Sequence, residues 1–346
     1  MLFVDKYCPN SFQGILFNHK SASQLIACAH YDQMPHLIIK GSEGSGKKTF
    51  ANLYIKAKYG ETVHTKQQTV EITSATKTIE LQMLYSDYHY QIDPSLHGVY
   101  DRVIVQGFIK DILQVRPISR VPYHIIIMTN ADRLTLEAQQ SLRRTLEKNI
   151  STCRFIFLVD QESSLIDSLI SRCVQIRLSA PTIDEIESVL MIICQREKVT
   201  CDYLHQIAIE ANRSLTHAIH RLQQYLLTHS SGFAPPVSFS ETSTLSVSSV
   251  DTCLDMVASH LTSAKTPEDI QRLRPILYDL LVQCVEPIKL MKGLFQRIFV
   301  TLPPPKQHHL IQLLAKYENT LKQGSKPIYH LEGFCLGVVE EGLRPT

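Results

Sequence analysis

The sequence has no long apolar run, no closely paired cysteines and no large excess of charge, and each absence excludes a class of protein. No segment approaches the ~20 apolar residues of a membrane-spanning helix, so we expect no membrane contact. The charged opening, residues 1–6, lacks the apolar stretch of a secretion signal. The nine cysteines include no CxxC pair, which indicates free thiols in a reducing compartment.

A net charge of +2 and an isoelectric point near 8.0 give the chain no strong overall attraction to nucleic acid. DNA binding would therefore need a local basic patch. The chain has fifteen histidines, but the pairs His217/His220 and His308/His309 have no carboxylate or cysteine nearby. We interpret them as surface or helix-capping residues and predict no metal ligands.

Short apolar runs alternate with stretches of helical spacing in the first half of the chain. The runs predicted to be strands are 36–40, 69–72, 125–128, 155–159 and 174–178. Helical spacing is found between them at 49–58, 102–114 and 136–148. Buried strands separated by helices predict an α/β fold, with a parallel sheet covered by helices, over residues 1–179.

The pattern becomes purely helical after Pro181. Thr182 followed by acidic residues is typical of a helix start, and residues 215–226 place apolar side chains on one helical face. We therefore expect a small helical domain at 180–230. A Ser-, Thr- and Pro-rich linker at 231–250 then leads to a third, all-helical unit at 251–346.

The segment after the strand at 36–40 carries the strongest chemical signal. It reads Gly41, Ser42, Glu43, Gly44, Ser45, Gly46, Lys47, Lys48, Thr49. A Gly-rich turn between a buried strand and a helix is typical of a phosphate-binding P-loop, in which backbone N–H groups surround phosphate and Lys47 reaches the outer phosphates. The alternative is a Gly-rich turn in an unrelated α/β fold. We predict that these nine residues bind ATP or ADP.

Two positions that normally serve magnesium are altered. A P-loop carries Ser or Thr after its lysine, whereas this chain carries Lys48. Thr49 cannot easily replace that hydroxyl, because one further residue turns the helix by about 100°. The strand at 125–128 should end in Asp and Glu, but Thr129 and Asn130 follow it. We interpret Asp132 as a cap for the next helix. The sequence thus predicts nucleotide binding without hydrolysis, and leaves Mg²⁺ without its usual ligands.

These features resemble those of the AAA+ clamp loaders, in particular the small subunits of eukaryotic replication factor C. Residues 142–147 are similar to that family's LRRTME helix. Ser171-Arg172-Cys173 matches its SRC motif, and residues 4–9 resemble its VDKYRP opening. Cys8 replaces the usual arginine of that opening.

Within the family, the resemblance is greatest to the ATPase-deficient subunit 3. The GKKT P-loop and the altered strand end are shared with it. Residues 323–332 resemble its QLGSKAIYHLE segment, and residues 151–154 match its STCR segment. The resemblance covers nearly the whole chain.

The resemblance also assigns residues around the nucleotide. It places Val4 and Tyr7 at the nucleotide, and it aligns Asp160 with a sensor asparagine and Thr216 with a lid arginine. Ser164 stands where a lysine-like residue is usual. Both sensor changes remove groups that would contact a γ-phosphate, which agrees with a site that does not hydrolyse ATP.

Arg172 is predicted to act on a neighbouring subunit. In the SRC motif this arginine is a finger that reaches the nucleotide of the next subunit, where a guanidinium offers several donors to the transferring phosphoryl group. The alternative is an ordinary surface arginine at a strand edge.

The helix at 102–114 is predicted to face DNA and the sliding clamp. The resemblance implies that Arg102 and Lys110 contact the phosphate backbone independently of base sequence. The alternative is that both are solvated helix charges. Phe108, Ile109 and Ile112 would contact the clamp or belong to the core, and the sequence does not separate these two roles.

The resulting hypothesis is a non-hydrolysing subunit of a replication factor C clamp loader in the nucleus. Its lid would be residues 180–230, and its collar, residues 251–346, would join five subunits in a ring. Its partners would be the other four subunits, the sliding clamp PCNA and primer–template DNA. The alternatives are an active AAA+ ATPase and an interaction protein that reuses the fold outside replication.

Overall fold

The structure is a computed structural model that forms two compact units, Met1–Pro235 and Pro236–Thr346. The residues that it describes are 1–31, 34–60, 65–73, 78–114, 123–149, 152–199, 201, 203–230, 249–263, 272–283, 285–324 and 326–340. Most of the predicted linker, residues 231–248, lies outside the described residues. Among those described, no helix combines the length and apolar character needed to cross a bilayer.

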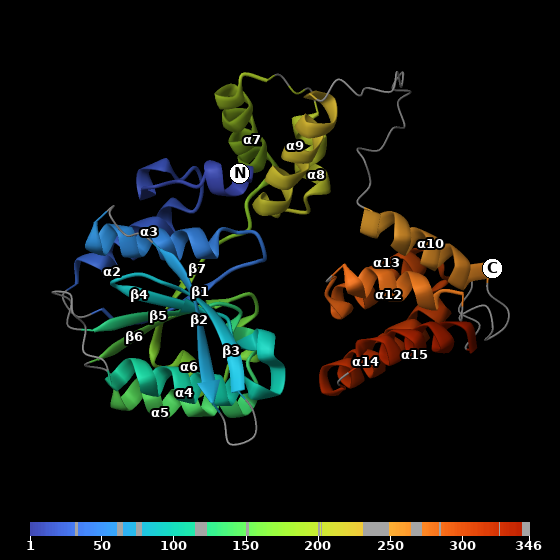
Figure 1. Ribbon diagram of the computed structural model, residues 1–346. Helices are drawn as coiled ribbons and strands as arrows, with labels where there is room; N and C mark the ends of the chain where they lie inside the picture. Colours follow the sequence, from blue (N-terminus) through green and yellow to red (C-terminus); the bar gives the residue numbers. More distant parts are fainter. Residues whose placement is uncertain are drawn as a thin grey trace. The chain divides into compact units, whose positions relative to one another are not determined.

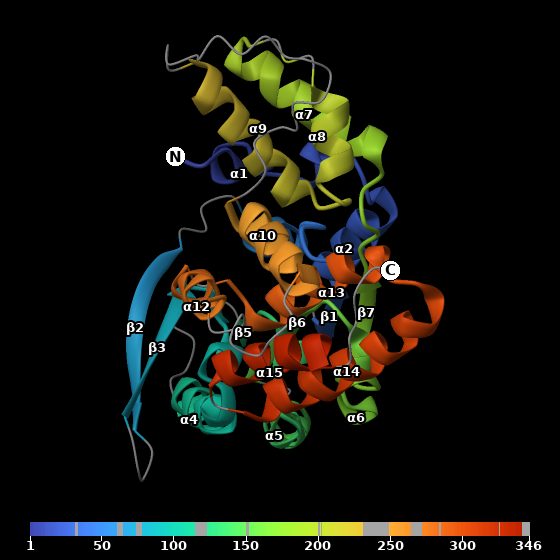
Figure 2. The ribbon, with the colours of Figure 1, turned by 90° about the vertical axis from the view of Figure 1, so that its right-hand side faces the viewer.

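The first unit contains a seven-stranded sheet with the order β2-β3-β4-β5-β6-β1-β7. Its strands are β1 (His36–Lys40), β2 (Lys66–Thr73), β3 (Thr78–Tyr85), β4 (His89–Ile92), β5 (His124–Met128), β6 (Cys153–Val159) and β7 (Cys173–Arg177). From β4 to β7 along this order all neighbours are parallel, whereas β2, β3 and β4 pair antiparallel. Figure 2 shows the long β2–β3 pair at the sheet edge.

The α/β fold class is therefore confirmed, but the sheet is mixed rather than wholly parallel. The strand at β3 was missed, although Ile79, Leu81 and Met83 are buried at every second position between exposed residues. That alternation is the ordinary signature of a strand with one buried face. The short strand β4 was also missed.

Helices cover both faces of this sheet (Figure 1). The helices before the lid are α1 (Phe3–Lys6), α2 (His19–His30), α3 (Lys47–Tyr59), α4 (Asp101–Gln114), α5 (Leu136–Lys148) and α6 (Asp167–Ile170). Because side chains alternate along a strand, Ile126 and Phe157 pack with α4 and α5, while Ile125 and Ile156 pack with α2 and α3. Burial on both faces explains why the central strands are continuous apolar runs.

Three helices follow the sheet: α7 (Ile183–Glu197), α8 (Leu204–Glu210) and α9 (Leu215–Ser230). The predicted threonine cap of α7 is confirmed as a capping box, in which the Thr182 hydroxyl accepts from Glu185 N and the Glu185 carboxylate accepts from Thr182 N. Such a cap stabilises a helix by about 1 kcal/mol. It fixes the point at which the chain leaves the sheet.

The second unit consists of helices around its own apolar core. They are α10 (Ser249–Ser263), α12 (Arg274–Val282), α13 (Pro287–Thr301), α14 (Pro304–Gln323) and α15 (Pro327–Glu340). Proline opens the last three, where its missing N–H costs nothing. Gly324 ends α14, and its N–H donates to Thr320 O at 2.9 Å.

Candidate nucleotide-binding site

The candidate site lies at the carboxyl ends of the parallel strands. Gly41 follows β1, Thr129 follows β5 and Asp160 follows β6, and these three strands are parallel. Their carboxyl ends therefore emerge side by side, as in other open α/β sheets that bind ligands at this edge. A hydrogen bond from Gly41 N to Val159 O, 3.1 Å, joins the P-loop to the end of β6.

The P-loop backbone suits a phosphate. Gly44 and Gly46 have φ values of 78° and 87°, which residues with a Cβ rarely adopt. Gly46 caps α3 without a side-chain hydrogen bond, so the first N–H groups of α3 need another acceptor. The buried Ser45 hydroxyl also lacks a partner among the described residues. Phosphate oxygens would meet these donors at the positive end of the helix.

The start of α9 lies against this loop. Leu215 N donates to Gly44 O at 3.2 Å, and a Cβ added to Gly44 would lie 2.1 Å from Ser214 Oγ. Thr216, which the resemblance aligns with a lid arginine, follows in the first turn of α9.

Lys47 is already paired within the site. Its Nζ donates to the carbonyl oxygens of Gly41 and Ser42, at 2.8 and 2.9 Å, and to Asp160 Oδ1 at 2.5 Å. The side chains of Lys47 and Asp160 are 13% and 25% exposed. Sequence reasoning treated Asp160 only as a lost sensor and missed this ion pair, because the pair joins two loops that are 113 residues apart.

The residues at the magnesium positions do not suit that ion. Lys48 is exposed on the first turn of α3, next to Thr49. Thr129 is buried, and its hydroxyl donates to Ile92 O at 3.2 Å. Asn130 Nδ2 donates to Asp93 Oδ2 at 2.6 Å. The phosphate cradle thus fits a nucleotide, whereas these side chains do not supply the carboxylates and hydroxyl that hold Mg²⁺.

The interpretation of Asp132 as a helix cap is wrong. Thr135 caps α5, and the Asp101 carboxylate accepts from Thr135 N and from its hydroxyl. Asp132 instead lies in a short 3₁₀ turn, where Oδ2 accepts from Gln161 N at 3.4 Å and Oδ1 is buried without a partner among the described residues. Burial, together with the nearby Asp160 carboxylate, raises the pKa of Asp132.

The opening segment lies between the lid and α3. Val4 is half-buried in α1, and the Tyr7 hydroxyl donates to Glu197 Oε1 of α7 at 2.5 Å. Cys8 Sγ is 4.0 Å from Thr49 Oγ1. Of this segment, Cys8 is therefore the residue beside the P-loop helix, whereas the Tyr7 hydroxyl is engaged by the lid, and contact of Val4 and Tyr7 with a nucleotide stays a prediction.

Arg172 lies at the amino ends of the parallel strands, opposite the P-loop. It immediately precedes β7, whose first residue, Cys173, pairs with His36 at the start of β1, whereas the P-loop follows the end of β1. The two sites are separated by the length of β1, five residues at roughly 3.3 Å each. Arg172 is therefore remote from the P-loop of its own chain.

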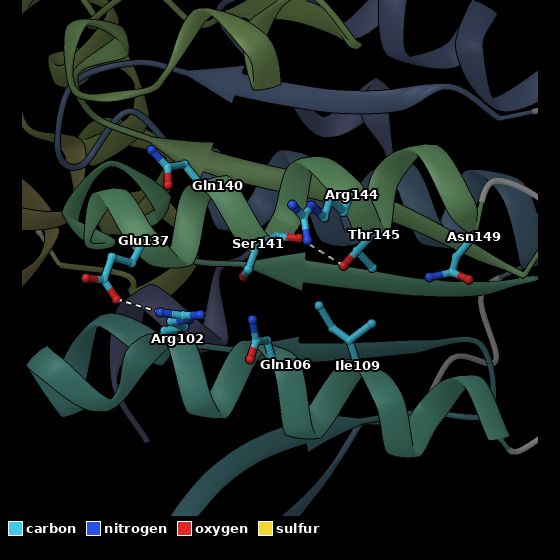
Figure 3. Close-up of a pocket in the computed structure, with 9 residues that line it drawn as sticks. All are labelled: Arg102, Gln106, Ile109, Glu137, Gln140, Ser141, Arg144, Thr145 and Asn149. Carbon is cyan, nitrogen blue, oxygen red and sulfur yellow. Dashed lines mark hydrogen bonds and ion pairs between the residues drawn. The ribbon is translucent and has the colours of Figure 1, made fainter.

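A polar groove runs between α4 and α5 (Figure 3). It is lined by Arg102, Gln106, Ile109, Glu137, Gln140, Ser141, Arg144, Thr145 and Asn149. Arg102 donates to Glu137 Oε2 at 2.8 Å across the groove, while Arg144 is exposed along α5. Sequence reasoning missed Arg144. The side chain of Lys110 lies outside the described residues.

The apolar residues of α4 belong to the core. Phe108, Ile109 and Ile112 are 3%, 3% and 7% exposed and pack in the cluster beneath the sheet. Of the two predicted roles, these three residues therefore have the one in the core.

A P-loop between a central parallel strand and a helix, with a helical lid against the loop, defines an AAA+ nucleotide-binding protein. A family model described as "Replication factor C subunit 3, C-terminal domain" matches residues 251–341, and one described as "DNA polymerase III, delta subunit" matches residues 17–182. Together the two matches cover most of both units.

Curated relatives match nearly the whole chain. Replication factor C subunit 3 of Mus musculus is 33% identical over 96% of this chain and 94% of its own. The Homo sapiens protein of that name is 32% identical with the same coverage, and replication factor C subunit 5 of Schizosaccharomyces pombe is 30% identical. This chain belongs to the replication factor C small-subunit family.

Proposed function

We propose that this chain is a non-hydrolysing subunit of a clamp loader, the complex that uses ATP to place a sliding clamp on primer–template DNA. Family membership supports the clamp-loader part. The altered magnesium positions Lys48, Thr129 and Asn130 support the absence of hydrolysis. The chain would act in the nucleus, in replication and repair.

The observation that carries the proposal is the location of Arg172 relative to the P-loop. Arg172 lies at the amino ends of the parallel strands and the P-loop at their carboxyl ends. Arg172 is therefore too far away to serve this chain's own nucleotide. A neighbouring subunit whose P-loop faced the amino ends of these strands would receive the guanidinium at its phosphates. There it would stabilise the charge that develops on the transferred phosphoryl group. The chain thus contributes catalysis to a partner while its own site remains inactive.

The nucleotide part of the proposal rests on the P-loop backbone. Residues 41–49 would hold the phosphates of ATP or ADP through the N–H groups at the start of α3, and Lys47 would supply positive charge. Bound nucleotide would supply no chemistry here beyond ordering the loop and the lid helix α9 that contacts it. Val4 and Tyr7 would lie beside it.

The DNA part of the proposal rests on the groove between α4 and α5. Arg102 and Lys110 would bind backbone phosphates, and the position of Arg144 in the same groove supports this use. A phosphate at Arg102 would replace the exposed carboxylate of Glu137 as partner. Such contacts are independent of base sequence and weaken with salt.

The proposed division of the chain is an AAA+ domain (1–179), a lid (180–230), a linker (231–250) and a collar (251–346). The collar would hold the subunit in a heteropentamer with the other replication factor C subunits. The AAA+ domain would face the clamp PCNA and DNA.

The test is to purify the native complex through a tag on this chain and identify its members. The other replication factor C subunits should copurify, and the complex should load the clamp on primed DNA in an ATP-dependent manner. Purification without those subunits would instead support an interaction protein that acts outside replication. Hydrolysis by the isolated chain would support an active ATPase.

A further inference from the structure

The start of the chain is attached to two separate parts of the first unit. We call residues 3–12, which include α1, the N-terminal strap. Its first half contacts the lid helices α7 and α9, and its second half contacts α3, the helix that follows the P-loop. Figure 2 shows α1 beside α9. Because the chain itself passes from the sheet to the lid between β7 and α7, the strap is a second connection between these parts.

The lid end of the strap converges on Glu197, the last residue of α7. Glu197 Oε1 accepts from the Lys6 ammonium group at 2.6 Å and from the Tyr7 hydroxyl at 2.5 Å. The Arg196 guanidinium lies 5.8 Å from the centre of the Tyr7 ring, within the range of a cation–π contact. A single carboxylate of the lid thus binds two consecutive side chains of the strap.

A backbone contact joins the strap to α9 as well. Leu2, at the N-cap of α1, makes no side-chain hydrogen bond to the first turn of that helix. The Gln223 side chain of α9 supplies an acceptor, because its Oε1 accepts from Phe3 N at 2.9 Å. The first N–H groups of a helix need such partners from outside the helix. The short helix α1 therefore depends on the lid for part of its own stability.

The other end of the strap is anchored on α3. Asn10 Oδ1 accepts from Lys56 Nζ at 3.0 Å, and the Phe12 ring is in edge-to-face contact with Phe50, with the ring centres 6.2 Å apart. Phe50 is buried in the core between α3 and the sheet. The ion pair at the lid end is more accessible to water, since the side chains of Lys6 and Glu197 are 46% and 23% exposed. The lid end is therefore the attachment that opens first.

We propose that the N-terminal strap is a latch that keeps the lid against the P-loop without the help of a nucleotide, and that Glu197 closes it. The inference rests on the proposed division into an AAA+ domain and a lid, and not on nucleotide binding. The closed latch preserves the hydrogen bond from Leu215 N, at the start of α9, to Gly44 O of the P-loop. When Glu197 releases the strap, the lid is free to move away from this loop.

The experiment follows hydrogen–deuterium exchange in the nucleotide-free, full-length chain by mass spectrometry, for the wild type and for Glu197→Ala. We expect exchange at the start of α9, including the Leu215 amide, to become about tenfold faster in the variant, because it loses a hydrogen bond to a charged group and a partly exposed ion pair. Exchange in β1, β5 and β6 should not change. Tyr7→Phe, which removes only the hydroxyl and keeps the ring, should give a smaller increase at the same amides.

The matched control is Glu187→Ala. Glu187 is also on α7, and its carboxylate pairs with His205 of α8 at 3.2 Å, so this pair lies within the lid. Its removal should leave exchange at the start of α9 at the rate of the wild type. An equal increase in the control would overturn the inference. So would faster exchange in Glu197→Ala that is confined to residues 1–7, or that extends equally through the strands of the sheet.

Nucleotide provides a second test of the latch. Saturating ADP or ATP should slow exchange at the start of α9 strongly in Glu197→Ala and less than twofold in the wild type, whose lid is already held. Strong protection of the wild type by nucleotide would show that nucleotide, and not the strap, holds the lid.

The latch and the proposed function fail in different ways. If the wild type copurifies with the other replication factor C subunits but Glu197→Ala exchanges like the wild type, the latch is wrong and the proposed function stands. If the chain copurifies with none of those subunits but Glu197→Ala gives the expected increase at α9, the latch stands and the clamp-loader assignment fails.

Discussion

Arg172 is held in place by Glu147. Its Nε and Nη2 lie 2.9 and 2.6 Å from Glu147 Oε1, and Nη1 donates to the carbonyl oxygen of Ser168 at 2.7 Å. Glu147 is on α5 and Ser168 on α6, so two helices orient one guanidinium that is still one-third exposed. This arrangement fixes the direction of the Arg172 side chain.

We expect Arg172→Ala to impair clamp loading by the reconstituted complex while assembly stays intact. An arginine finger in trans contributes about 10³–10⁵ in rate in GTPases. Only one site of the ring would lose it, so the total DNA-stimulated ATPase should fall by only a fraction and clamp loading by more. Both activities are measured beside Arg177→Ala, an exposed arginine of β7 that follows the motif. Normal loading by the Arg172 variant would make it an ordinary surface arginine.

The isolated chain should hydrolyse no ATP above background. The reason is structural: the Thr129 hydroxyl is committed to Ile92 O, Asn130 to Asp93, and Lys48 offers no metal ligand. A steady-state phosphate-release assay with the purified chain tests this expectation, and Lys47→Ala is the control for contaminating activity. Turnover of about 1 s⁻¹, the low end of the kinase range, that disappears in the Lys47 variant would contradict it.

Removal of the second unit should abolish copurification with the other subunits. A chain that ends at residue 248 loses α10 to α15 and the whole of their apolar core. Full-length Lys47→Ala should assemble normally, because the proposed ring contacts lie in the collar and not at the nucleotide. Circular dichroism of the shortened chain checks that its first unit is folded. Normal assembly of a folded, shortened chain would show that the collar assignment is wrong.

Substitution of the groove arginines should weaken DNA binding in a salt-dependent way. For the complex with Arg144→Ala or Arg102→Ala, we expect the slope of log K against log[salt] to decrease by about 0.9 for each phosphate that the protein no longer neutralises. The matched control is Arg143→Ala: Arg143 neighbours Arg144 on α5, pairs with Glu147 and does not line the groove. An unchanged slope in both groove variants would remove this groove from the DNA-binding surface.

Two buried histidines should make the first unit sensitive to acid. Burial lowers the pKa of His36 to about 4, with a further contribution from Arg154, and burial likewise lowers the pKa of His89 to about 4. The unfolded chain takes up these protons near the ordinary histidine pKa of about 6.5, before the folded chain does. Stability is therefore full above that pH and decreases as the pH falls toward 4, by about 3 kcal/mol per histidine.

The measurement is the urea midpoint at about pH 7.5 and about pH 5, for the wild type, His89→Asn and the exposed-site control His19→Gln. The difference between the two midpoints should shrink in the His89 variant and stay unchanged in the control. An equal pH dependence in all three proteins would show that His89 does not cause the acid sensitivity.

Several parts of this protein could be predicted because they depend only on residues that are neighbours in the chain. The P-loop, the Thr182 cap and the apolar runs of β1, β5 and β6 are local patterns, because a turn, a cap or a buried strand is specified within a few residues. The family was also identified from the sequence, since Ser171-Arg172-Cys173 and residues 323–332 are contiguous segments.

Contacts between residues that are distant in the chain could not be predicted in this way. The Lys47–Asp160 pair, the Arg172–Glu147 pair and the burial of Ile112 each depend on strand order and helix packing, which bring together residues that no local pattern connects. Asp132 shows the same limit, because its proximity to a helix start suggested a cap that Asp101, on another helix, supports instead. Arg172 precedes β7, and the P-loop follows its parallel neighbour β1. The two are therefore at opposite ends of these strands, separated by the full length of a strand.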